Sequence, residues 1–230
     1  MTTQQNRRLP LYKFYPTLLD AYQWYLISER EDAAQDLINK INRVPITDSD
    51  SLTRIAKGTA INNLVDRAIK NPEILFTDSG LINETVGGLL FCFPCQLIHD
   101  IAFRLHYSAQ QMFIQSEFDC NGINILLYGY VDYIREDRCI DLKSTKAYEL
   151  GKYRDSMQKH LYPLILDLNG SPVKDFEFIV TDFENIYSEV YPVDLRESAA
   201  IIKQSCEGLI NFIGVNKSLI TDTKIFGGEK

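Results

Sequence analysis

Two aspartates and a lysine, Asp132, Asp141 and Lys143, lie on either side of a predicted turn at residues 135–138. A hairpin loop that is symmetric about this turn places Asp132 directly opposite Asp141 on the neighbouring strand. Directly opposed side chains have Cβ atoms about 4.5–5.5 Å apart, and like charges at that distance destabilise a strand pair. Two carboxylates in this arrangement favour a divalent cation with oxygen ligands, such as Mg²⁺ or Mn²⁺.

Lys143 lies two residues after Asp141, and alternate residues of a strand point to the same side. An ammonium group beside a bound cation can hold a phosphate group or orient a water molecule. Both positive charges then offset the negative charge that develops during hydrolysis of a phosphodiester. The same pattern also fits two solvated aspartates on the polar face of a half-exposed sheet, which is the ordinary place for such residues.

Alternation along the two strands predicts the faces of this hairpin. We expect Asp132, Asp141 and Lys143 to share a polar face. We expect the opposite face to form the core, with the apolar side chains of Ile125, Leu127, Val131, Tyr133, Ile140 and Leu142.

The rest of the chain supplies elements that can position these residues. Apolar residues at helical spacing predict helices over residues 15–41, 52–69, 91–110, 151–168 and 195–213. Alternating runs predict strands over residues 112–118, 123–134, 139–143, 175–181 and 187–192, and residues 76–85 are polar and typical of turns. This order predicts an α/β fold in which helices flank a mixed central sheet.

The composition is that of an ordinary globular protein. The chain has 230 residues, 45% of them hydrophobic and 24% charged, which suits a single domain. We expect one domain over residues 1–230, with a mainly helical part in residues 1–110 and the catalytic core in residues 111–215. Five scattered cysteines, a polar N-terminus and only short apolar runs favour an intracellular, cytoplasmic protein without a membrane partner.

The charge is distributed unevenly. A formal net charge of −7 argues against a protein that coats nucleic acid, because phosphate binding requires lysine and arginine. Residues 143–160, however, hold five basic and two acidic residues, a local charge of +3. This segment can guide a phosphate backbone, or it can simply be a solvated helix face.

Three motifs, in order along the chain, resemble those of the PD-(D/E)XK nucleases, and most closely their RecB-like and lambda-exonuclease-like branch. They are Gly129-Tyr-Val-Asp132, Ile140-Asp-Leu-Lys-Ser-Thr145 and Gln158-Lys-His-Leu-Tyr162. They are similar to the G-x-x-D, D-x-K-T and Q-x-x-x-Y motifs of that branch. Side chains four residues apart share one helix face, so Gln158 and Tyr162 can both point to one site. The resemblance covers mainly residues 129–166.

The resemblance implies a restriction-endonuclease-like core and a Mg²⁺- or Mn²⁺-dependent DNA nuclease. The expected activity is that of an exonuclease used in recombination, repair or mobile-element replication. A homo-oligomer, or a recombination or replication protein as partner, also fits the family. The resemblance gives the following roles: Asp132, Asp141 and the main-chain carbonyl of Leu142 bind the metal, Lys143 polarises the water or the phosphate, Gln158 and Tyr162 bind the substrate, and Gln158 also positions the water.

The sequence departs from the family at one position. Lys57-Gly58-Thr-Ala-Ile-Asn62 resembles a family helix whose histidine contributes to metal binding, but Asn62 stands at the place of that histidine. An amide oxygen can bind a hard cation, yet it carries no charge. Asp66, one helical turn later, is a possible substitute. A nuclease-fold protein that binds nucleic acid or a protein without cutting, and a purely structural protein, therefore remain as alternatives.

Two further groups of residues are set aside. A turn at Asn121-Gly122 pairs Glu117 with Leu126, which lies about 20 Å along the strand from Asp132. Cys92-Phe-Pro-Cys95 with His99 imitates half of a zinc site, but no second pair of ligands follows. We expect neither group to belong to the site.

Overall fold

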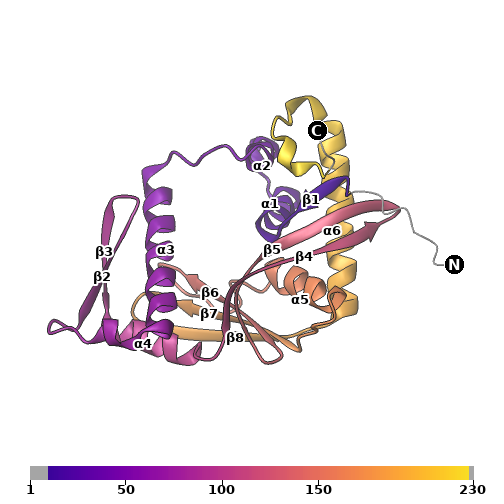
Figure 1. The fold of residues 1–230 in the computed structure, drawn as a ribbon. Coiled ribbons are helices and arrows are strands. Elements are labelled where there is room, and N and C mark those ends of the chain that lie inside the picture. The colour runs from indigo at the N-terminus through magenta and orange to yellow at the C-terminus, as the bar shows by residue number, and fades with distance from the viewer. Residues whose placement is uncertain (1–9, 228–230) are drawn as a thin grey trace.

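The structure is a computed structural model that describes residues 10–227 (Figure 1). Its central sheet has six strands and is mixed. The strands are β1 (Tyr12–Phe14), β4 (Ala109–Cys120), β5 (Ile123–Arg135), β6 (Arg138–Ser144), β7 (Asp175–Thr181) and β8 (Ile186–Pro192). The order β1-β5-β6-β7-β8 runs across the sheet, and β4 pairs with β5 as well. The β1–β5 and β6–β7 pairs are parallel, whereas the other pairs are antiparallel.

The long strand β5 has two different partners along one of its edges. β1 pairs with residues 125–127 of β5, and β6 pairs with residues 133–135. The other edge of β5 is occupied by β4 along almost its whole length. Between its β1 and β6 partners, β5 therefore has a short stretch that no strand pairs on this edge. The sheet forks there, and Asp132 stands at the β6 side of the fork.

Helices cover both faces of the sheet (Figure 1). The first apolar cluster joins the sheet to α1 (Pro16–Ile27), α2 (Ala33–Ile41), α5 (Gln158–Leu168) and α6 (Leu195–Val215). The second cluster joins the other face to α3 (Ser49–Lys70), α4 (Cys95–Arg104) and the hairpin of β2 (Leu81–Val86) and β3 (Leu89–Pro94). Short 3-10 helices span Pro72–Leu75, Lys217–Leu219 and Thr223–Ile225.

The two longest helices begin at aspartate caps. The side chain of Asp48 accepts the backbone N–H of Ser51 at 2.8 Å, and that of Asp194 accepts the N–H of Glu197 at 2.9 Å. Each cap satisfies an N–H group that has no partner within its helix. The cap fixes helix α3 at its N-terminal end. Farther along the helix, Gly58 lies close to Ser144 of β6, and Asp66 contacts Tyr133 of β5.

The mixed α/β architecture is confirmed, and the bounds or types of four predicted segments are corrected. The helix predicted over residues 15–41 is two helices, because the polar residues 28–32 between them have no apolar side chain to bury. Residues 91–94, predicted as the start of a helix, belong to strand β3 instead, and Phe93 packs into the second cluster. The turn-like stretch 76–85 includes most of β2, and the strand predicted over residues 112–118 extends to residues 109–120.

The start of α5 is also corrected. The predicted helix over residues 151–168 begins only at Gln158, because residues 149–155 form a series of turns. Gly151 adopts a φ of +83°, which a helix cannot contain. Residues 1–110 carry strands β1 to β3 in addition to helices. No helix in residues 10–227 combines the length and the apolar character that a membrane crossing requires.

Candidate active site

The predicted hairpin register is confirmed up to the fork. Tyr133 pairs with Ile140, and the next two pairs toward the turn follow the same register. The ladder of paired residues ends at Tyr133. The next contact between the two strands is made by the carboxylate of Asp132. Its Oδ2 atom accepts the backbone N–H of Leu142 at 3.1 Å. Asp132 is thus anchored to β6 by its side chain at the point where the two strands diverge.

The predicted faces of the hairpin need correction. Ile125, Leu127 and Val131 lie in the first apolar cluster, whereas Tyr133, Ile140 and Leu142 lie in the second. Helices cover both faces, so the six residues do not form one core surface. For the same reason the predicted polar face is not solvated. Asp141 is only 2% exposed, which argues against the simple alternative of a surface aspartate.

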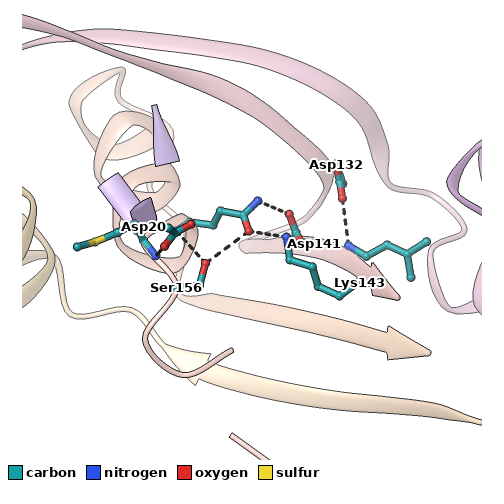
Figure 2. Close-up of polar contacts among 8 residues, drawn as sticks. Asp20, Asp132, Asp141, Lys143 and Ser156 are labelled. Atoms are coloured by element: carbon teal, nitrogen blue, oxygen red, sulfur yellow. Dashed lines mark hydrogen bonds and ion pairs between the residues drawn. The ribbon is translucent and has the colours of Figure 1, made fainter. Parts of the chain in front are cut away.

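Asp141, Lys143 and Gln158 form a closed triangle of polar contacts (Figure 2). The ammonium Nζ of Lys143 lies 2.8 Å from Oδ2 of Asp141 and donates to Oε1 of Gln158 at 2.6 Å. Nε2 of Gln158 donates to Oδ1 of Asp141, also at 2.6 Å. Each of the three side chains therefore fixes the other two. The structure brings together three of the residues that the sequence predicts for the site.

The charges of this site influence one another strongly. Burial raises the pKa of Asp132 to about 7, and the nearby carboxylate of Asp141 adds to this effect. The N–H of Leu142 and the ammonium of Lys143 partly counteract it. Burial opposes the charge of Lys143, but the carboxylates of Asp141 and Asp132 outweigh it, so the pKa of Lys143 is raised. Asp141 is buried and Asp132 is half-buried, and when both are ionised they share one lysine, so the site then carries a surplus of negative charge.

Asp20 is a residue of this site that sequence reasoning missed. It lies on α1, and its Oδ1 atom accepts the backbone N–H of Met157 at 2.7 Å, directly before α5 begins at Gln158 (Figure 2). Burial raises the pKa of Asp20, and the charge of Asp141 raises it further. Asp20 therefore positions the helix that presents Gln158. Nothing in the residues around Asp20 distinguishes it in the sequence.

Gly129 explains the first position of the G-x-x-D motif. A Cβ atom at this position would lie 2.6 Å from Cε1 of Tyr162. The bare backbone of β5 therefore lets the Tyr162 ring pack against it, and this contact sets α5 close to the sheet. Tyr162 is buried, and burial is the main cause of the raised pKa of its hydroxyl. Tyr162 thus stands beside the site as a packed side chain rather than as an exposed one.

Helix α3 brings a third acid toward the site. A Cβ atom on Gly58 would lie 3.0 Å from Oγ of Ser144, so α3 approaches the end of β6 closely. Two turns later Asp66 accepts the hydroxyl of Tyr133 at 2.6 Å, and its charge contributes to the raised pKa of Asp132. Asn62 lies between Gly58 and Asp66 on the same side of the helix. The helix that resembles the metal-binding helix of the family therefore does face β5 and β6.

The oxygen atoms of this site fit a hard divalent cation. Oδ2 of Asp141 is buried and has the ammonium of Lys143 beside it, but no hydrogen bond of good geometry. The site offers two carboxylates that repel each other and the carbonyl of Leu142. These are the ligand types that Mg²⁺ and Mn²⁺ prefer. In residues 10–227 no three His, Cys, Asp or Glu side chains are grouped to hold a metal. A cation at Asp132 and Asp141 would therefore complete its shell with carbonyl and water oxygens.

Glu117 and the Cys92–Cys95 pair take no part in the polar contacts among Asp141, Lys143 and Gln158. Glu117 pairs with Leu126, as expected, and accepts a hydrogen bond from Asn124 at 3.0 Å. Cys92 is exposed and Cys95 is buried.

A basic cavity of about 620 Å³ opens at the end of β6, next to Lys143. It lies against Ser144 and Thr145, and its only acidic side chain is Asp182. Asp182 is itself bound by the backbone N–H groups of Glu184 and Asn185. The four cationic side chains that line it are Arg54, Lys57, Lys146 and Lys152. A cavity of about 710 Å³ between α1 and α6 contains neither the two aspartates nor the lysine of the site.

The fold is shared with a protein of known structure. The crystal structure of a protein named "Putative exonuclease" from Eubacterium rectale superposes with a TM-score of 0.51 and 14% identity, over 96% of this chain and 88% of that one. A second structure, of the protein SSO0001, matches over 83% of this chain and 84% of that one at 12% identity, with a TM-score of only 0.35. No protein-family model matches the sequence. No curated protein matches it either. The chain thus has the fold of the Eubacterium rectale protein.

Proposed function

We propose that this protein is a divalent-metal-dependent DNA nuclease of the PD-(D/E)XK type, and that it acts as an exonuclease. The observation that carries the proposal is the position of Lys143, whose ammonium is held between Asp141 and Gln158 near the half-buried acid Asp132. A purely structural sheet has no use for a buried and a half-buried aspartate that repel each other. Because such a cluster costs folding stability, a ligand that relieves the repulsion is the simplest reason for it.

Each residue has a distinct role in this proposal. Asp132, Asp141 and the carbonyl of Leu142 would hold a divalent cation, and a bound cation would supply an activated water and offset charge on the phosphate. Hydrolysis joins the phosphorus to a water oxygen and breaks its bond to a sugar oxygen, so negative charge develops around the phosphorus. The ammonium of Lys143 offsets this charge, and Gln158 keeps the ammonium in place.

The basic cavity supports a nucleic acid as the substrate. A phosphodiester backbone is a chain of single negative charges. Arg54, Lys57, Lys146 and Lys152 present four positive charges to a cavity that is also lined by Ser144, the residue after Lys143. None of these four takes part in an ion pair within the part of the chain that the structure describes. Their charges are therefore available to a strand that leaves the site. The name of the Eubacterium rectale protein points to the same class of reaction.

One observation favours a second candidate function, a nuclease-fold protein that binds nucleic acid without cutting it. Asn62 gives α3 a neutral amide at the place where the family has a metal-binding histidine. This alternative predicts that the protein binds DNA and takes up no cation.

A cleavage assay separates these functions. End-labelled linear DNA and covalently closed circular DNA are incubated with Mg²⁺, Mn²⁺ or EDTA. The wild type is compared with Asp141→Asn and Lys143→Gln, and Lys70→Gln, on the exposed end of α3, serves as the matched control. The exonuclease proposal expects loss of linear DNA alone, dependent on the cation, with a decrease of about 100-fold or more in both site variants.

Other results have clear meanings. Cleavage of the circle shows an endonuclease, and activity in Asp141→Asn that equals the wild type overturns the proposed site. Absence of cleavage, with DNA binding and no uptake of Mn²⁺ by calorimetry, favours the non-cutting alternative. Circular dichroism confirms that each variant is folded.

A further inference from the structure

Four aromatic rings form a continuous row on the surface formed by β4 and β5. The rings of Tyr15 and Tyr128 have centroids 5.6 Å apart, and that of Tyr128 lies 6.4 Å from the ring of Phe113. Phe113 in turn lies 5.1 Å from Tyr130. The rings come from the start of α1 and from two strands, so no local sequence pattern reveals the row.

The row runs along β5 toward Asp132. Burial alternates along this part of the strand, with Leu127, Gly129 and Val131 buried and the residues between them more open. Tyr128 and Tyr130 therefore point to the same side. Tyr130 precedes Asp132 by two residues, about 7 Å along the strand. The aromatic row thus ends close to the candidate metal ligand.

Two of the four rings are open to solvent. Tyr130 is 59% exposed and Phe113 is 48% exposed, although aromatic side chains of this size are usually covered. At the far end of the row the guanidinium of Arg43 lies 5.9 Å from the Tyr15 ring and donates to the hydroxyl of Tyr128 at 3.4 Å. Arg43 also pairs with Asp222 at 2.9 Å.

A second cation lies on the same face. Lys13 of β1 pairs with Leu126, and registered residues of neighbouring strands point to one side. Cations beside a row of exposed rings match a ligand that alternates negative charge with flat aromatic groups. Unpaired nucleic-acid bases on their phosphate backbone have this chemistry, whereas the bases of a closed duplex are stacked on each other and present no face.

We propose that the aromatic row binds unpaired bases of the substrate strand and guides a single-stranded segment to Asp132. This inference rests on the proposed nuclease function and specifies its substrate as a single strand or a duplex with an unpaired end. Each ring offers a surface to any base, so the row selects for the absence of pairing and not for sequence.

Fluorescence anisotropy tests the proposal directly. A labelled oligothymidylate strand and a blunt duplex of the same length are titrated with the full chain in EDTA, which prevents cleavage. In Tyr130→Leu and Phe113→Leu the affinity for the single strand is expected to fall about tenfold, while that for the duplex stays within about twofold. Tyr130→Phe retains the ring and the affinity. Phe103→Leu, a ring 73% exposed on α4 and outside the row, is the matched control.

The outcomes distinguish this inference from the function on which it rests. If the wild type cuts DNA but the ring variants keep their single-strand affinity, or lose duplex affinity equally, the row does not bind bases and the nuclease proposal stands. Sedimentation of the variants as monomers beside a self-associated wild type identifies the row as an interface between copies and also overturns the inference. A wild type that neither binds nor cuts any nucleic acid overturns both proposals.

Discussion

The side-chain amide of Gln158 donates to Oδ1 of Asp141 at 2.6 Å, across 17 residues of sequence and from the first turn of α5 to the middle of β6. The oxygen of the same amide accepts the ammonium of Lys143. An amide can satisfy a carboxylate and an ammonium together, because it presents a donor and an acceptor side by side. Gln158 thus sets the orientation of the acid and of the lysine.

Replacing Gln158 is therefore expected to disturb the site without removing a charge. Gln158→Ala frees both partners, and cleavage is expected to fall about 10- to 100-fold, as is usual when a group that orients a metal ligand is lost. Gln158→Glu keeps the acceptor for Lys143 but sets a carboxylate against Asp141, so a larger loss is expected. Initial rates on linear DNA measure both effects. Gln35→Ala, at an exposed position of α2, is the matched control, and full activity in Gln158→Ala would contradict the role of this residue.

A second prediction concerns the repulsion between Asp132 and Asp141. The pKa of Asp132 is raised from 3.8 to about 7, so this carboxyl keeps its proton up to a higher pH in the folded state than in the unfolded state. Its ionisation therefore lowers stability as the pH rises through this interval, and the full cost applies above about pH 7. Asp132→Asn keeps an acceptor for the N–H of Leu142 but cannot ionise. In EDTA at pH 8 this variant is expected to melt several degrees higher than the wild type, and the advantage should vanish near pH 4.

The same variant reveals cation binding without any measure of activity. Mn²⁺ or Mg²⁺ bound to the native state raises the melting temperature of the wild type by mass action. Asp132→Asn, which has lost a charged ligand, should show little or none of this shift. An equal shift in both proteins would place the cation elsewhere. Ser116→Ala, on β4 and away from the fork, serves as the control for nonspecific effects of substitution in the sheet.

The hairpin at the centre of the site could be predicted because its information is local. Asp132 and Asp141 are separated by one tight turn, and the pairs from Tyr133–Ile140 to the turn follow the register that alternation predicts. The ladder ends one pair before Asp132 and Asp141, so their predicted pairing within the ladder is not formed. The spacing of Gln158 and Tyr162 on a helix is local information as well and needs no knowledge of the fold. Burial of the site could not be predicted in this way, because it depends on helices that approach from both ends of the chain.

Contacts that span most of the chain have no local signal. The pairing of β1 with β5 joins Tyr12 to Ile125, and the cap that Asp20 provides for Met157 joins residues 137 apart. Neither a three-residue strand nor one aspartate differs from its surroundings in composition. The β2–β3 hairpin is different: Gly87-Gly88 between two apolar runs is a hairpin signal, and it could have revealed the strands that were predicted as turn and helix.

A third prediction follows from the packing of Tyr162 on Gly129. In Gly129→Ala the added Cβ must displace the ring or the helix that carries it, because it would lie 2.6 Å from Cε1. The free energy of unfolding is expected to fall by about 1–3 kcal/mol, as for other overpacked cores. Denaturation in urea measures the change. Cleavage should also fall, since a shift of α5 moves Gln158.

A double-mutant cycle tests this cause. Tyr162→Leu makes room for the Cβ, so Gly129→Ala should cost less in that background than in the wild type. Equal costs in both backgrounds would mean that the glycine is needed for another reason. Gly214→Ala, on α6, is the matched control, because a Cβ atom there would have no neighbour within 4 Å.

The last prediction uses His160, which is buried on α5 two residues after Gln158 and lies 3.1 Å from Oγ of Ser198. Burial lowers the pKa of His160 from 6.5 to about 4, and the nearby charge of Lys159 adds to this effect. Between these pH values the unfolded chain binds a proton that the folded chain does not. Stability is therefore expected to fall as the pH drops from about 6.5 to about 4, by on the order of 2 kcal/mol from this residue.

Urea denaturation at pH 7 and pH 4.5 measures this loss, and His160→Gln isolates it. Glutamine can still bond to Ser198 but does not titrate, so the variant should lose less stability between the two pH values than the wild type. Other acidic groups contribute equally to both proteins and cancel in the comparison. His106→Gln, at an exposed position, should follow the wild type. If the His160 variant and the wild type lose the same stability, the imidazole is already protonated in the folded protein, and the start of α5 is then open to solvent.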